Sequence, residues 1–202
     1  MKFLRKSSEN EMIAEFLKAE INSKRFGKYL LEALKRCKSS KRIVESPRLY
    51  NKQENKLRKQ ILREYRGYSR NEGLFKNFPT KVNWERVSLS LDDLERVKYI
   101  DYEYWIELSG GSRLATDAVK NIKAGFVVFD QSNELFFEVA KVLRKRKTLP
   151  LLILVSTDKN GYVVILEGHL RLTAYLLEPE SISAPVEAII GYSRDFTKWG
   201  LY

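Results

Sequence analysis

Hydrophobic residues are most concentrated between residues 148 and 177, where two short apolar runs flank a polar segment. The runs Leu149–Val155 and Tyr162–Leu166 have the length of strands, and Ser156–Gly161 between them is rich in residues that form turns. Apolar residues then recur at helical spacing, which predicts a helix beginning near Gly168. This helix should end at Glu178, because the residue before a proline is disfavoured in helical geometry.

Weaker patterns of the same kind predict the other elements of residues 79–202. The expected strands are Trp84–Leu89, Phe126–Phe129 and Pro185–Gly191, and the expected helices are Leu91–Val97, Thr116–Ile122 and Asn133–Lys147. We expect Phe196, Trp199 and Tyr202 to pack the end of the chain against this region. The mixture of strands and helices predicts an α+β core with a small mixed sheet.

The first 78 residues have the pattern of amphipathic helices. Ser8 is a candidate N-cap before an apolar face that runs from Met12 to Ile21. A second helix should contain Phe26 and Leu30, and a third should run from about Lys52 to Tyr65. The loop 67–79, rich in glycine, asparagine and proline, is the expected boundary. We therefore predict a helical N-terminal region, 1–78, packed on an α+β core, 79–202.

Composition limits the class of protein. The chain has 202 residues, of which 44% are hydrophobic, enough to build a core. Its single cysteine fits a reducing cytoplasm, and no apolar run has the length of a membrane helix or a signal peptide. We expect a cytoplasmic protein without a membrane partner.

The positive charge is confined to the N-terminal region. The net charge of +11 divides into +12 for residues 1–76 and −1 for residues 77–202. The third helix carries basic residues on one face, at Lys52, Lys56, Arg58, Lys59, Arg63 and Arg66. Residues 52–66 could contact nucleic-acid phosphates. The alternative is that this face is simply solvated, and we favour it, since no known DNA-binding motif is present.

The strongest chemical signal is a strand that leads through Gly168 directly into a helix. The first turn of a helix has unpaired N–H groups and a partial positive charge, so it attracts anions, phosphate above all. Glycine permits close approach to the backbone. His169 and Arg171 follow at once and could add charge-assisted hydrogen bonds, with Leu170 between them.

Glu167-Gly168-His169-Leu170-Arg171, after a hairpin and before a helix, resembles the Gly-x-x-Arg phosphate motif of the ParB/sulfiredoxin-like superfamily. The similarity extends over about residues 126–191, and the whole chain resembles uncharacterised bacterial proteins with this domain. The resemblance implies that the helix N-terminus holds the phosphates of ATP or CTP. His169 stands where sulfiredoxin has its catalytic cysteine, so sulfiredoxin chemistry is not expected.

The expected function is therefore binding of a nucleotide or phosphorylated small molecule, with phosphotransfer or nucleotide hydrolysis as a possible activity. Glu167 and His169 are the candidate catalytic residues, and Mg²⁺ could accompany the phosphates. The competing interpretation of Glu167 is a hydrogen-bond anchor of the turn, and that of Arg171 is an ion pair with Glu167. The alternative function is a non-catalytic nucleic-acid-binding or nucleotide-sensing accessory protein.

Two further segments are candidates for the same site. The turn that contains Ser109, Gly110, Gly111 and Arg113 precedes a helix and could be a second anion cradle or a plain connection. The segment Tyr99–Trp105 holds three tyrosines and a tryptophan, which favours core packing, with an aromatic wall for a nucleobase as the alternative.

Overall fold

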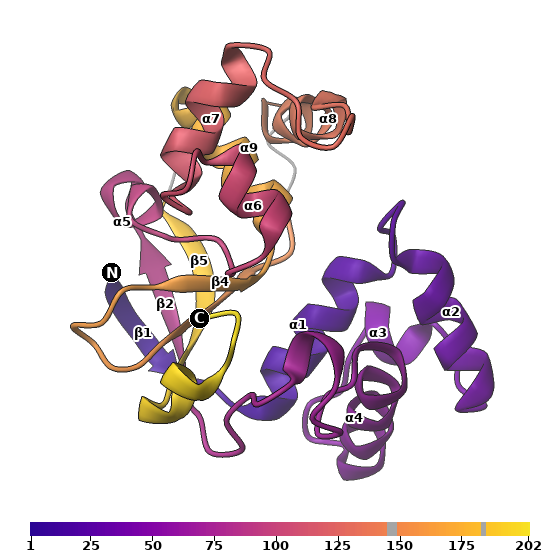
Figure 1. The fold of residues 1–202 in the computed structure, drawn as a ribbon. Coiled ribbons are helices and arrows are strands. Elements are labelled where there is room, and N and C mark those ends of the chain that lie inside the picture. The colour runs from indigo at the N-terminus through magenta and orange to yellow at the C-terminus, as the bar shows by residue number, and fades with distance from the viewer. Residues whose placement is uncertain (145–148, 183–184) are drawn as a thin grey trace.

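The described residues, 1–144, 149–182 and 185–202 of a computed structural model, contain one five-stranded mixed sheet. The strand order is β1-β2-β5-β3-β4, and only β3 and β5 are parallel neighbours. The strands are β1 (Lys2–Lys6), β2 (Asn83–Leu89), β3 (Leu152–Ser156), β4 (Val164–Glu167) and β5 (Val186–Tyr192). Helices lie on both faces of this sheet (Figure 1). The predicted α+β fold with a mixed sheet is confirmed.

The central strands are buried on both faces, which explains their continuous apolar runs. In β3, Ile153 and Val155 belong to one core, whereas Leu152 and Leu154 belong to the other. This is the period-two alternation of a strand, with an apolar layer on each side. The motif at Gly168 follows the edge strand β4, so it lies between the two layers.

One core joins the sheet to a group of N-terminal helices, drawn in indigo and purple in Figure 1. They are α1 (Glu9–Glu20), α2 (Gly27–Arg36), the short α3 (Arg42–Glu45) and α4 (Lys52–Arg66). The predicted cap is confirmed, because the Ser8 hydroxyl accepts from the Glu11 N–H at 3.2 Å. Asn51 caps α4 in the same way, and Gly67, with φ of 82°, ends it.

The second core joins the opposite face to the helices that follow β2. They are α5 (Leu91–Glu95), α6 (Glu103–Leu108), α7 (Ala115–Lys123), α8 (Glu134–Arg144) and α9 (His169–Leu177). Three 3₁₀ turns, η1 (Gly73–Phe75), η2 (Pro179–Ser181) and η3 (Arg194–Lys198), complete the assignment. The predicted end of α8 at Lys147 lies outside the described residues.

Three local predictions differ from the structure. Residues 2–6 form β1, so the start of the N-terminal region belongs to the sheet of the core. The predicted strand Phe126–Phe129 is a turn, in which Phe126, Val127 and Phe129 are exposed and Phe129 has a positive φ of 51°. Part of the aromatic segment 99–105 begins helix α6, which the sequence pattern did not indicate.

The end of the chain is fixed to the fold, as predicted. Phe196, Trp199 and Tyr202 are buried, and the Trp199 indole donates to the Leu74 carbonyl at 2.9 Å. No helix in the described ranges is long and apolar enough to span a membrane.

Candidate functional site at the N-terminus of helix α9

Gly168 is required by both its backbone and its surroundings. Its φ of 109° lies in the left-handed region, and a Cβ would lie 2.7 Å from the Leu152 side chain and 2.8 Å from the Arg171 guanidinium. The close approach expected for a ligand is therefore made by the protein's own side chains. Any ligand has to bind beside this contact.

Arg171 is held by an ion pair with Glu167. One guanidinium nitrogen donates to the Glu167 carboxylate at 2.7 Å and to the Leu151 carbonyl at 3.2 Å. Arg171 is only 8% exposed, and its Nε has no hydrogen-bond partner among the described residues. The ion pair of Arg171 with Glu167, one of the two interpretations of Arg171, is thus present in the structure. The Nε–H group of the arginine remains without an acceptor among the described residues.

His169 lies in an aromatic stack rather than in an open cleft. Its ring is 4.9 Å from Trp105 and 5.9 Å from Tyr99, both nearly parallel. Burial lowers the pKa of His169 to about 3, and Arg66, Arg171 and Arg25 contribute to the same shift. At neutral pH the imidazole is uncharged, so the expected charge-assisted bond from His169 to phosphate is not available. Tyr99 and Trp105 pack on this histidine, as the favoured interpretation of core packing predicts, whereas Tyr102 of the same segment is exposed.

The first turn of α9 keeps free donors. Gly168 supplies no side-chain cap, and the turn contains no acidic residue. In the described part of the chain, the N–H groups of His169, Leu170 and Arg171 have no acceptor outside the helix. A hydrogen bond from the Thr173 hydroxyl to the His169 carbonyl, 2.8 Å long, fixes this turn. The predicted helix start after Gly168 is therefore present, and it carries no side-chain cap.

Residues from the N-terminal helices complete the surroundings of this helix end. Glu20, at the end of α1, is 3% exposed and lies 3.7 Å from Arg66 of α4. Of the buried side-chain polar atoms without a hydrogen-bond partner in the described residues, five lie at this junction. They are Glu20 Oε2, Tyr65 OH, Arg66 Nε, His169 Nε2 and Arg171 Nε. Glu20 and Tyr65 lie close enough for a hydrogen bond between them to shift the pKa of both groups. The three nitrogen atoms of Arg66, His169 and Arg171 are therefore the atoms of this group that a ligand or water would satisfy. Buried polar atoms normally have a hydrogen-bond partner. Water or a polar ligand at the junction would supply the partners that these atoms lack.

Charged side chains of the N-terminal helices and of the Gly168 motif influence one another at the junction. Burial raises the pKa of Glu20 to about 7, Arg66 opposes the rise, and Glu167 adds to it. The guanidinium of Arg66 also lies 4.4 Å from the centre of the Phe26 ring. A cavity of about 270 Å³ opens at the end of α4, and Tyr65 and Arg66 are among its lining residues. All of its lining residues belong to the end of α4 or to residues 67–74, and none belongs to α9, so this cavity is not part of the helix end itself.

The second candidate cradle is used for structural contacts. The guanidinium of Arg113 donates to the Tyr99 carbonyl at 2.8 Å and to the Tyr202 carbonyl at 2.8 Å. The Ser109 hydroxyl accepts from the Arg113 N–H, while Gly110 and Gly111 adopt positive φ in the turn. These contacts match the interpretation of a plain connection that also fixes the C-terminal residues.

The basic face predicted for α4 is smaller in the structure. Arg58 is completely buried, Lys59 is paired with Glu9 at 2.9 Å, and Arg66 faces the junction. Lys52, Lys56 and Arg63 remain exposed. Half of the six cations are thus engaged within the protein, so a nucleic-acid contact along 52–66, the less favoured of the two interpretations, would depend mainly on Lys52, Lys56 and Arg63.

Glu20 and Tyr65 were missed as site residues because their roles depend on tertiary contacts. The sequence does contain a signal for Glu20, which falls at helical spacing on the apolar face with Phe16 and Leu17. A carboxylate on a buried face requires a partner. No group of three His, Cys, Asp or Glu side chains suited to a metal occurs in the described ranges.

Comparisons of the chain with protein-family models, curated proteins and solved structures each found no match.

Proposed function

We propose that this protein binds a phosphorylated ligand, such as a nucleotide, at the N-terminus of α9. The observation that carries the proposal is the group of unsatisfied buried polar atoms beside an uncapped helix end. An anion would accept from the free N–H groups of His169, Leu170 and Arg171, and from the unused donor of Arg171. Arg66 would supply a further positive charge from the N-terminal helices.

The resemblance to the ParB/sulfiredoxin-like superfamily supports ATP or CTP as the ligand. Mg²⁺ would bind mainly through the phosphate oxygens, with Glu20 and Glu167 as the nearby carboxylates. Phosphotransfer or hydrolysis, with catalytic roles for Glu167 and His169, stays a prediction.

Thermal unfolding with pyrophosphate, ATP and CTP, each with and without Mg²⁺, tests the proposal. A ligand that binds only the folded state raises the melting temperature with concentration. Calorimetry should then show that Arg66→Gln weakens binding about tenfold or more, the loss of one charge-assisted hydrogen bond.

Lys18→Gln is the matched control, because Lys18 is an exposed cation on α1. It should bind like the wild type. If none of these phosphates shifts the melting temperature at millimolar concentration, or if Arg66→Gln and Lys18→Gln bind equally well, the proposed site is wrong.

A further inference from the structure

An exposed aromatic side chain stands among cations at the other end of α4. Tyr50 is 83% exposed, the highest value among the large exposed hydrophobic side chains of the described residues. The Arg42 and Arg48 side chains are each about half exposed, and Lys52 and Lys56 are exposed one turn apart on α4. An exposed ring with several cations around it offers both stacking and charge.

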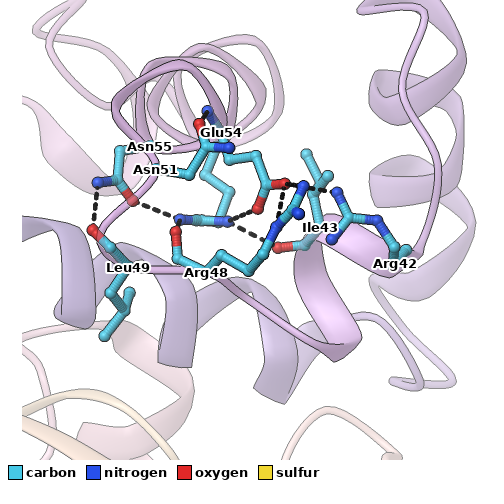
Figure 2. Close-up of polar contacts among 8 residues, drawn as sticks. Arg42, Ile43, Arg48, Leu49, Asn51, Glu54 and Asn55 are labelled. Carbon is cyan, nitrogen blue, oxygen red and sulfur yellow. Dashed lines mark hydrogen bonds and ion pairs between the residues drawn. The ribbon is translucent and has the colours of Figure 1, made fainter.

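The backbone segment that carries Tyr50 is held by hydrogen bonds and ion pairs to α4. Figure 2 shows Arg42 and Arg48 converging on Glu54, which lies in the first turn of α4. The Asn55 amide donates to the Leu49 carbonyl at 2.7 Å. Tyr50 is two residues from Arg48, whose pKa is raised by its hydrogen bond to Glu54.

A fully buried arginine completes this support. Arg58 donates to the Ile43 carbonyl at 3.0 Å and to the Arg48 carbonyl at 3.3 Å, and it also bonds the Asn55 side chain. A buried guanidinium is costly unless it is paired and hydrogen-bonded. Here its donors fix the backbone before and within the loop 46–51. The backbone next to Tyr50 is therefore fixed by the fold.

We infer that Tyr50, Arg42, Arg48, Lys52 and Lys56 form a binding surface for single-stranded nucleic acid. A base would stack on the Tyr50 ring, while Lys52 and Lys56 contact the phosphates. Arg42 and Arg48 are paired with Glu54, so they would contribute only through their remaining N–H groups. Single-stranded nucleic acid has exposed bases and a flexible backbone. It can therefore bring a base and its neighbouring phosphates to the same protein loop. Duplex DNA keeps its bases stacked inside and offers only its phosphates.

This surface is separate from the proposed phosphate site, because Tyr50 precedes the N-terminus of α4 and Arg66 is its last residue. It also differs from the face predicted along residues 52–66, since it includes the loop before the helix and excludes Arg58, Lys59 and Arg66. The two bindings can therefore be tested independently.

Fluorescence anisotropy with a labelled oligothymidylate of about 15 nucleotides tests the inference. Tyr50→Ala should weaken binding about fivefold to a hundredfold, the range for loss of one stacked base. Lys52→Gln should weaken binding and reduce the salt slope by about one. Tyr102→Ala and Lys18→Gln are the controls, since Tyr102 is a 49% exposed tyrosine on another element and Lys18 is an exposed cation on α1.

The inference is overturned if the oligonucleotide does not bind at about 150 mM salt, or if Tyr50→Ala binds as tightly as Tyr102→Ala. Equal affinity for single-stranded and duplex DNA would identify a general polyanion surface instead, as would complete displacement by polyglutamate. Calorimetry with ATP or CTP on the Tyr50→Ala protein should match the wild type.

Discussion

Replacing Arg171 by methionine should lower the free energy of unfolding by about 3–5 kcal/mol, the cost of removing one partner of a buried ion pair. The loss leaves the Glu167 carboxylate, whose side chain is 15% exposed, without its cation. It also removes the hydrogen bond to the carbonyl of Leu151, the residue before β3, which ties this segment to the start of α9. Guanidinium chloride unfolding followed by circular dichroism measures this change.

Lys198→Met is the control for the Arg171 variant. Lys198 also pairs with an acid, Asp195, at 2.7 Å, but both side chains are more than half exposed. Such a pair contributes less than about 1 kcal/mol. The double variant Glu167→Gln/Arg171→Met should lose less free energy of unfolding than the sum of the losses in the two single variants. Equal losses for Arg171→Met and Lys198→Met would show that the pair at Gly168 does not support the fold.

The centre of the fold could be predicted from the sequence because its elements bury complete faces. Strand β3 alternates between two cores, and α9 packs its apolar side on one of them, so periodicity and turn residues determine both. Strand β1 could not be found in this way, because all five of its side chains are exposed and alternation is absent. Conversely, the apolar residues 126–129 suggested a strand, yet most of them are exposed in a turn.

The candidate site was predictable only in its local part. Glycine between a strand and a helix indicated the turn, and the spacing of Glu167 and Arg171 indicated their ion pair. Burial of Arg58 and the approach of Glu20 to Arg66 depend on how α1 and α4 pack together, and charge patterns do not encode this. A charged residue on an apolar helical face was the available signal in both cases.

Glu20 should make the stability of the protein depend on pH in a direction unusual for a carboxylate. Its pKa is raised from 4.5 to about 7, first by burial and then by Glu167, while Arg66, Tyr65 and Arg171 oppose the rise. The folded state therefore holds the proton more tightly than the unfolded state. Below pH 4.5 the ionisation of Glu20 does not lower the free energy of unfolding. This destabilisation grows as the pH rises toward 7, and it is complete above that value.

Glu20→Gln removes this titration and should stabilise the protein at high pH. From the shift in the pKa of Glu20, the variant should gain about 3 kcal/mol in free energy of unfolding at pH ~8. This gain should fall to less than about 1 kcal/mol at pH ~5. Urea unfolding across this range measures the difference from the wild type, with Glu32→Gln as the control because Glu32 is an exposed carboxylate on α2. A gain that does not change with pH, or a loss at high pH, would mean that the folded protein holds Glu20 ionised beside Arg66. In that case the junction would carry less net positive charge, and its attraction for phosphate would be weaker.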